Sequence, residues 1–395
     1  MTNDNNLSVS RIEERKSLQL PRREASGVSP RRLHCPQGLF SAPKSKFKSN
    51  FMLRAKILIN DCFQGDAMQY RQLGKNGPLV SAIGYGCMQF AVSYGASLPK
   101  EDGIRIIREA FDQGVTLFDT AQVYGPFTNE CLVGEALSDI RQEVIIATKF
   151  GYRFEDGKRG NLCSHPKNIR QTVEDSLRRL QTDYIDILYQ HRVDPDVPME
   201  EVAGTVKDLH DEGKVRWFGM SEAGIGAMTA AAREFPVTVL ESEYSLWWRE
   251  PEEKILPFLE KEGIGFVPFS PLGRGFLTGM VKPGSQFLNN DIRKGIPRFS
   301  VENQEKNWPL VEKIQAYAQK LNLTAAQLAL AWLINRKPFI VPIPATTNRL
   351  RLIQNTLAGD VHLSHEVLQE LEDLTAAVPI SGDRYDEKGL KIVNR

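Results

Sequence analysis

The sequence predicts a closed barrel of eight parallel β-strands, each followed by a helix, with a short β-hairpin at its start. From residue 82 onward, eight short apolar runs alternate with helix-like segments. Most of these runs lack polar alternation, which is typical of parallel strands buried on both faces. Eight such units over roughly 250 residues or more suit a (β/α)8 barrel. An open, doubly wound sheet is the alternative, but "GYGCM" at 84–88 is not its usual GxGxxG turn.

The elements are expected in a regular order along the chain. Residues 68–88 alternate around a central Gly-Lys-Asn-Gly-Pro, which predicts the hairpin and the approach to the first strand, "AIGYG". The strands that follow are expected at 115–120, 143–149, 184–191, 215–221, 237–242, 264–270 and 339–344. The helices are expected at 101–113 (where Gly114 is a common stop signal), 128–139, 167–180, 199–212, 223–234, 252–262, 304–320 and 324–335, with a further helix starting near Asn348. A long loop at 271–303 interrupts the rhythm.

Composition limits the classes of function. The chain has 395 residues and a net charge of +1, which gives no electrostatic case for binding nucleic acid. No apolar stretch is long enough to cross a bilayer. An odd number of cysteines without a CxxC pair argues against a disulfide framework and a zinc site, so we expect no metal and a cytoplasmic location. The cysteines are Cys35, Cys62, Cys87, Cys131 and Cys163.

Residues 1–67 differ from the rest of the chain. They hold 12 Lys+Arg against 6 Asp+Glu, a net of +6, whereas the remainder has 38 against 43, a net of −5. This Ser-, Pro- and Arg-rich segment shows no apolar period, so we expect most of it to be disordered. Glu13, Glu14 and Glu24 weaken the interpretation as a transit peptide, which is poor in acids, and the basic residues are too scattered for a nucleic-acid tail. We prefer upstream sequence in front of a barrel domain at 68–395.

Polar residues stand where the predicted strands end, and a barrel keeps its catalytic groups at those ends. Asp119 ends the second strand, Tyr124 lies in the loop after it, Lys149 ends the third strand and His191 the fourth. An ammonium group stabilises a phenolate, a carboxylate keeps that ammonium charged, and a histidine can orient a carbonyl group. Together these four residues would make a proton donor for an oxygen that becomes an alkoxide as hydride reaches its carbon.

Each of these residues also has a simpler interpretation. An aspartate at a strand end is most often a helix cap or turn former, and a single tyrosine or histidine in a loop usually serves packing. Lys149 alone could be a surface residue, or a Schiff-base lysine of an aldolase. All four at successive strand ends of one barrel are a much more specific observation.

The chain from Met68 to Arg395 resembles the aldo-keto reductase superfamily, and most of all its branch of plant auxin-induced, perakine-reductase-like and bacterial proteins. The resemblance is carried in family order by "QYRQLGKNGPLVSAIGYGCM", "FDTAQVYG", "VGEAL", "IIATKFG", "DYIDILYQHRVDP", "GKVRWFGMSEA", "SEYSLWWREPE", "PFSPLGRGFLTG" and "IPATTNRLRLIQN". It implies a catalytic tetrad of Asp119, Tyr124, Lys149 and His191, with the tyrosine as general acid. It also implies NADPH, with NADH as the alternative, bound across the barrel mouth.

The resemblance assigns a cofactor role to two groups of positions. Ser221 matches the residue that holds the nicotinamide carboxamide, and Phe269 matches an aromatic residue that stacks on the ring. The full set is Ser221, Glu222, Glu241, Phe269, Ser270, Pro271, Leu272, Gly273, Arg274, Thr347, Asn348, Arg351, Gln354 and Asn355. Glu241 departs from the family, which usually has Gln there, and a carboxylate cannot donate a hydrogen bond. Asn348 stands where a basic residue often lies, which leaves NADPH favoured over NADH but not fixed.

Three functions therefore compete. The first is an NADPH-dependent oxidoreductase that reduces an aldehyde or ketone to an alcohol, acting as a monomer or weak homo-oligomer on a small carbonyl substrate. The second is a cofactor-sensing regulatory subunit that resembles the β subunits of potassium channels. The third, a Schiff-base aldolase, is disfavoured by the complete tetrad.

Overall fold

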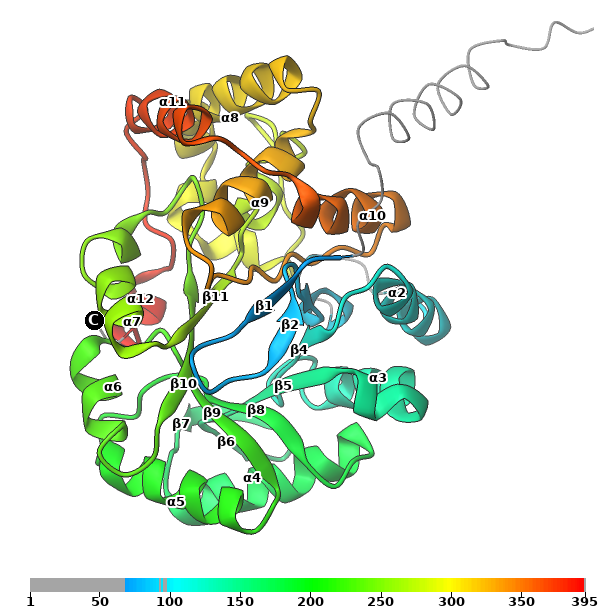
Figure 1. Cartoon of the computed structure of the whole chain (residues 1–395), viewed down its shortest axis with the longest axis vertical. Coiled ribbons are helices and arrows are strands. Elements are labelled where there is room, and N and C mark those ends of the chain that lie inside the picture. The colour runs from blue at the N-terminus through cyan, green and yellow to red at the C-terminus, as the bar shows by residue number, and fades with distance from the viewer. Residues whose placement is uncertain (1–67, 92–93, 95–97, 394–395) are drawn as a thin grey trace, which may run out of the picture. The chain divides into compact units, whose positions relative to one another are not determined.

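Seven parallel strands form the central sheet of this computed structural model, which describes residues 68–91, 94 and 98–393. In spatial order the sheet runs β11, β10, β9, β8, β5, β4 and β3 (Figure 1). The strands are β3 (Tyr85–Gly86), β4 (Leu117–Asp119), β5 (Ile145–Phe150), β8 (Ile185–Gln190), β9 (Val215–Ser221), β10 (Val237–Glu243) and β11 (Gly265–Phe269). The extension expected at 1–67 lies outside the described residues.

The eighth predicted strand, 339–344, closes the barrel without forming a regular strand. On one side Val341 and Ile343 donate backbone hydrogen bonds to β11, at 2.9 and 3.1 Å. On the other side the carbonyl of Pro342 accepts from Gly84, just before β3, at 2.9 Å, and that of Pro344 accepts from Gly86 of β3 at 3.2 Å. The prolines have no N–H to donate, so this side of the ladder is only half complete. The barrel prediction is confirmed, but its last strand is reduced to a hydrogen-bonded extended segment.

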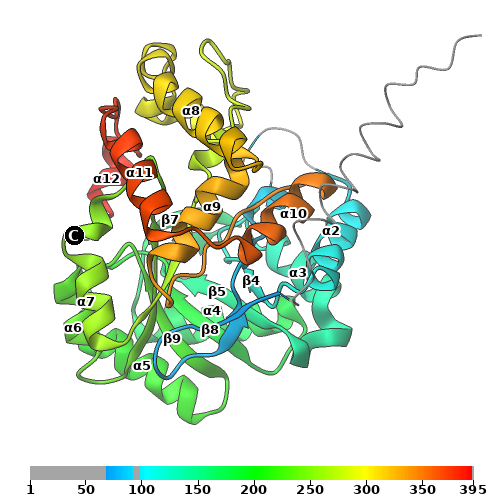
Figure 2. The ribbon, with the colours of Figure 1, turned by 45° about the horizontal axis from the view of Figure 1, so that its top comes forward.

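Helices lie outside the strands, as the alternation of strand and helix patterns predicted (Figure 1). In α4 (Pro166–Leu180) the buried residues include Ile169, Val173, Leu177 and Leu180, which share one face because they are three or four positions apart. The other helices are α2 (Lys100–Asp112), α3 (Thr128–Leu137), α5 (Met199–Asp211), α6 (Ile225–Ala231), α7 (Ile255–Glu262), α8 (Val301–Lys320), α9 (Ala325–Arg336), α10 (Arg349–Leu357), α11 (His365–Ala376) and α12 (Glu387–Lys391). Helices α8, α9 and α11 lie together (Figure 2). No helix of the described ranges is long and apolar enough to span a membrane.

Two hairpins flank the barrel. The predicted one, β1 (Tyr70–Gln72) with β2 (Leu79–Ser81), lies against the amino ends of β10 and β11. Its turn needs Gly74, where φ is +77° and a Cβ atom would lie 2.5 Å from a backbone oxygen. The second hairpin, β6 (Tyr152–Glu155) with β7 (Lys158–Leu162), was not predicted. It turns at Asp156–Gly157, both with positive φ, so the "DG" turn signal was present in the sequence.

Alternate residues of the barrel strands point inward, and this period places the polar groups. Inside the barrel, one apolar cluster contains Leu117, Ala147, Val239 and Val267 of four strands, together with Leu73 and Val80 of the first hairpin. Two residues after each of the four strand positions come Asp119, Lys149, Glu241 and Phe269. Because side chains of a strand repeat on one face every second residue, these four belong to the layer at the carboxyl end of the barrel.

Candidate active site

Lys149 and Asp119 form a buried ion pair between the adjacent strands β4 and β5. Lys149 Nζ lies 2.6 Å from Asp119 Oδ1 and 2.5 Å from Oδ2, and it donates to the Thr120 carbonyl at 3.1 Å. Burial alone lowers the pKa of Lys149, but the carboxyl groups of Asp119 and Glu241 raise it above its usual value. The lysine therefore stays protonated, and an ammonium group cannot attack a carbonyl, which counts against the aldolase alternative.

Tyr124 is brought beside this ion pair by the loop that follows β4. Its ring centroid lies 5.4 Å from Lys149 Nζ. Burial raises the pKa of Tyr124 above its ordinary value, and the Lys149 charge opposes this rise without overcoming it. From the sequence, Lys149 is expected to lower the pKa of the phenol, but burial outweighs that contribution. The phenol is thus a protonated group at neutral pH, the state from which a general acid donates.

His191 completes the group of four at this end of the barrel. Its ring meets the ring of Tyr124 edge-on, with centroids 6.0 Å apart and an interplanar angle of 87°. Burial, together with the nearby charges of Arg192 and Lys149, lowers the pKa of His191 well below its usual value. The imidazole is therefore neutral, so one ring nitrogen carries a proton and the other is an acceptor.

Glu241 is a second carboxyl group beside the same lysine. Its Oε2 atom lies 3.2 Å from Lys149 Nζ, and its side chain is 4% exposed. Burial, followed by the charge of Asp119, raises the pKa of Glu241 to about 8. Asp119 and Glu241 thus share one cation. The negative charge that Glu241 would add in place of the usual Gln is largely absent at neutral pH, because the carboxyl group is protonated.

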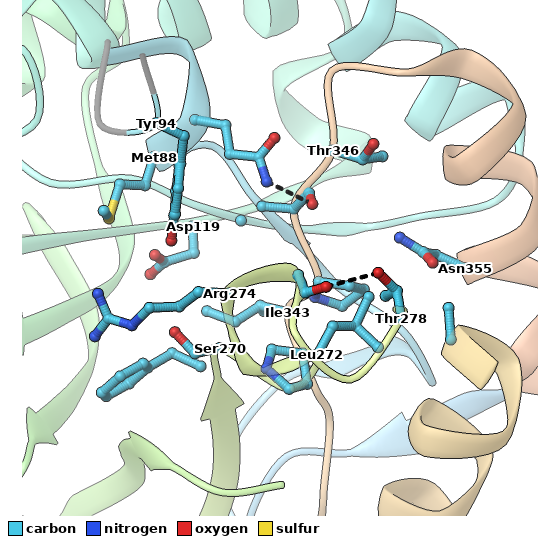
Figure 3. Close-up of a pocket in the computed structure, with 18 of the residues that line it drawn as sticks. Met88, Tyr94, Asp119, Ser270, Leu272, Arg274, Thr278, Ile343, Thr346 and Asn355 are labelled. Atoms are coloured by element: carbon cyan, nitrogen blue, oxygen red, sulfur yellow. Dashed lines mark hydrogen bonds between the residues drawn. The ribbon is translucent and has the colours of Figure 1, made fainter. Parts of the chain in front are cut away.

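A cavity of about 670 Å³ opens above these residues. Figure 3 shows Asp119, Ser270, Arg274 and Tyr94 toward one end, with Thr346 and Asn355 toward the other. Most of the residues expected to bind a cofactor line it: Ser221, Glu241, Phe269, Ser270, Pro271, Leu272, Arg274, Thr347, Arg351, Gln354 and Asn355. Of the expected catalytic residues Asp119, Tyr124 and His191 line the cavity, while Lys149 is buried against them.

Three expected cofactor residues do not line this cavity. Glu222 is buried, accepts a hydrogen bond from the Glu243 amide at 2.9 Å and forms an ion pair with Arg384. The backbone of Gly273, with φ of +57°, packs against Trp247, where a Cβ atom would lie 2.7 Å from the indole ring. Asn348 is exposed and caps α10 by accepting from the Arg351 amide at 3.1 Å. The positions of these residues point to structural roles.

Arg192 and Tyr385 are among the cavity residues that were not sequence-based candidates. Arg192 is buried and donates to Ser221 Oγ at 3.2 Å and to the Tyr385 hydroxyl at 3.3 Å. Tyr385 comes from the C-terminal segment and lines the same cavity. Arg192 follows His191 in the matched "QHR" and could have been noted there. Nothing near Tyr385 in the sequence indicates a contact with a residue 193 positions away.

The chemistry of this end of the cavity fits a polar, nicotinamide-like ligand. Buried polar atoms without a hydrogen-bond partner among the described residues include His191 Nδ1 and Arg192 Nε. Unpaired buried polar atoms cost free energy, so such a group favours a ligand that supplies both donors and acceptors. Arg274 and Arg351 add positive charge to the walls, which suits phosphate groups. Within the described ranges, no group of three or more His, Cys, Asp or Glu side chains could hold a metal ion.

Comparison with known proteins gives one consistent result. The model of the aldo/keto reductase family matches residues 82–376. A probable aldo-keto reductase 1 from Glycine max is 42% identical over 315 residues, which cover 80% of this chain and 91% of that protein. Among solved structures, a glycerol dehydrogenase from Gluconobacter oxydans superposes with a TM-score of 0.72 at 27% identity, covering 79% of this chain and 97% of its own. An aldo/keto reductase from Klebsiella pneumoniae in complex with NADP and acetate gives 0.62 at 26% identity, with 80% and 98% covered.

Proposed function

The chain belongs to the aldo/keto reductase family, and we propose that it reduces a small aldehyde or ketone to an alcohol with NADPH, using Tyr124 as the general acid. Its enzyme class follows from the family: it is an oxidoreductase that uses a nicotinamide cofactor on carbonyl compounds. The observation that carries the finer proposal is the buried Asp119–Lys149 ion pair beside the protonated Tyr124 at the end of the cavity.

Each residue of this site has a different role in the transfer of a proton to the substrate. The bound cofactor supplies the hydride. Tyr124 donates its hydroxyl proton to the carbonyl oxygen, and the Lys149 ammonium stabilises the phenolate that remains. Asp119 keeps the ammonium charged and fixed in place. The neutral His191 orients the carbonyl group through its ring N–H, a role that a preorganised donor performs best in a buried site.

Arg351 and Arg274 would hold the phosphates of the cofactor, while Ser221 and Glu241 would face its carboxamide. These four residues line the same cavity, from the catalytic end to the start of α10. Arg351 is the cation that favours a ribose 2′-phosphate, and hence NADPH, since Asn348 is turned to a capping role.

The test is a comparison of the wild-type protein with Tyr124→Phe. Consumption of NADPH is followed with a panel of small aldehydes and ketones, and NADPH binding is measured separately. We expect turnover to fall by about 10²- to 10⁴-fold while the NADPH Kd stays nearly unchanged. Tyr184→Phe, a tyrosine outside the cavity, serves as the matched control.

Two results would contradict the proposal. Full turnover by Tyr124→Phe would exclude the tyrosine as the acid. Tight NADPH binding by the wild-type protein without turnover of any carbonyl compound would instead favour the cofactor-sensing alternative.

A further inference from the structure

Glu241 occupies an unusual position, since it lies beside a catalytic ion pair that is already neutral. Asp119 and Lys149 balance each other, and Glu241 adds a second carboxyl group 3.2 Å from the same ammonium. Its Oε2 atom is buried, and the ammonium that it contacts is already paired with Asp119. Because one ammonium serves two carboxyl groups, one of these carboxyl groups can keep its proton in the free site.

Glu241 belongs to the wall on which a cofactor ring would lie. It stands opposite Ser221 in the register of β9 and β10, and both side chains line the catalytic end of the cavity. Phe269 of the neighbouring strand lines it as well. A ligand placed between Ser221, Phe269 and Tyr124 thus comes close to a carboxyl group that can change its charge by gaining or losing a proton.

We propose that Glu241 makes this site distinguish the oxidised from the reduced cofactor by charge. The nicotinamide ring is cationic in NADP⁺ and neutral in NADPH. The Glu241 carboxyl stays protonated with NADPH and releases its proton to solvent when NADP⁺ binds, because an ionised carboxylate attracts the cationic ring. This inference rests on the proposed function, since it requires a nicotinamide ring at this end of the cavity.

The groups that face Glu241 set the pH range in which it can release its proton. They are Asp119 of β4, Tyr124 of the loop after it, Lys149 of β5, and Tyr189 and Arg192 at the end of β8. Burial raises the pKa of Tyr124 and of Tyr189, and the pKa of Lys149 is raised as well, so these groups keep their protons at neutral pH. Burial raises the pKa of Asp119 as well, and its two contacts to Lys149 oppose that rise.

The Glu241 carboxyl, whose pKa is raised to about 8, therefore changes charge between about pH 7 and 9. Raising the pH then strengthens NADP⁺ binding and leaves NADPH binding nearly constant. At lower pH the oxidised cofactor leaves more readily, which favours the direction of carbonyl reduction.

The experiment measures the Kd of NADP⁺ and of NADPH from pH 7 to 9.5 for wild-type protein and for Glu241→Gln. The 2′-phosphate and the pyrophosphate are common to both ligands, so their effects cancel in the ratio of the two constants. We expect the wild-type Kd for NADP⁺ to fall about tenfold relative to that for NADPH across this range, because binding is linked to the release of one proton. The ratio should be flat in Glu241→Gln, which keeps the shape of the side chain.

Calorimetry supplies a second readout that does not depend on turnover. When NADP⁺ binding is measured near pH 7.5 in buffers of different ionisation enthalpy, the wild-type protein should release about three-quarters of a proton, because a carboxyl group with a pKa of about 8 is protonated to that extent at this pH. Glu241→Gln should release close to none. Glu130→Gln removes a buried carboxylate that pairs with Arg179 away from the cavity, and it should keep the wild-type dependence on pH.

The outcomes distinguish a failure of the proposed role of Glu241 from a failure of the proposed function. A pH-independent ratio in the wild-type protein, or an unchanged pH dependence in Glu241→Gln, would overturn the role of Glu241 and leave the proposed function intact. If neither NADP⁺ nor NADPH binds, the proposed function itself fails.

Discussion

Two of the groups of buried charges in the described part of the barrel are built differently. The open cluster, Asp119, Lys149 and Glu241, lies inside the carboxyl end of the strands. The closed cluster is Arg141, Asp186 and Arg216, near the amino ends of β8 and β9. Both are centred on side chains that are nearly inaccessible to solvent.

In the closed cluster every buried charge is matched. Asp186 accepts from Arg141 at 2.6 Å, from Arg216 at 3.0 Å and from the backbone amide of Ile146 at 3.0 Å. Arg141 donates its remaining hydrogens to the Thr182 hydroxyl and to the carbonyls of Val144 and Tyr184. Because its hydrogen bonds are satisfied within the protein, this cluster has no need of a ligand.

The open cluster has more acid than base, because Asp119 and Glu241 share the single ammonium of Lys149. It also lines a cavity, whereas none of the closed cluster does. A buried group that is fully paired fixes structure, while one left incomplete at a cavity wall is available for a substrate or cofactor. Removing a charge from the open cluster should therefore lower activity, whereas removing one from the closed cluster should lower stability.

The largest effect is expected when the cation is removed from the open cluster. Lys149→Met takes away the charge that opposes the raised pKa of Tyr124, so the phenolate formed on proton transfer is no longer stabilised. We expect kcat/KM for carbonyl reduction near neutral pH to fall by about 10³-fold or more. Steady-state kinetics with the best aldehyde of the panel measures this.

Lys261→Met, at an exposed lysine on α7, is the matched control and should retain full activity. A loss of less than tenfold in Lys149→Met would show that the ammonium group is not part of the proton-donating machinery.

A somewhat smaller effect, of another kind, is expected in the closed cluster. Asp186→Ala leaves the Arg141 guanidinium buried with no carboxylate, which should lower the free energy of unfolding by about 3–5 kcal/mol. Denaturant titration measures the loss. The kcat of the protein that remains folded should change little, since no member of this cluster reaches the cavity.

The double variant Arg141→Met with Asp186→Leu tests the reason for that loss. It removes both buried charges together, so it should be far less destabilised than Asp186→Ala alone. An equal loss in both variants would mean that packing at this position, and not the unpaired charge, sets the stability.

The sequence was enough to predict that residues of the open cluster lie together, but it was not enough to predict the closed cluster. Asp119, Lys149 and His191 stand at strand ends, and a barrel places strand ends together, so short-range patterns were enough to bring them to one site. Their catalytic roles remain predictions that the kinetics will test. The family pattern also marked Glu241 as unusual, but only the structure shows its 3.2 Å approach to Lys149.

The closed cluster and the C-terminal contacts depend on tertiary structure alone. Arg141 meets Asp186 across 45 positions, and Arg384 meets Glu222 across 162, with no periodic pattern to connect them. The eighth strand was overestimated because its apolar run outweighed Pro342 and Pro344 in the argument, although proline weakens a ladder. The hairpin at 152–162 was missed despite its Asp-Gly turn.

The smallest effect is expected from Glu241→Gln, which removes the excess acid of the open cluster so that its buried charges balance, as they do in the closed cluster. The effect of this substitution on stability should depend on pH. The pKa of Glu241 is raised from 4.5 to about 8 on folding, so between these values the folded protein holds a proton that the unfolded chain has lost. The stability of the wild-type protein therefore falls as the pH rises through this range, and the Gln side chain does not titrate. We expect Glu241→Gln to match the wild-type free energy of unfolding near pH 4.5 and to exceed it by a margin that grows until the pH passes about 8. Denaturant titrations of both proteins across this range decide the point, because a constant difference at all pH values would mean that Glu241 is already ionised in the folded protein and that the open cluster tolerates its second charge.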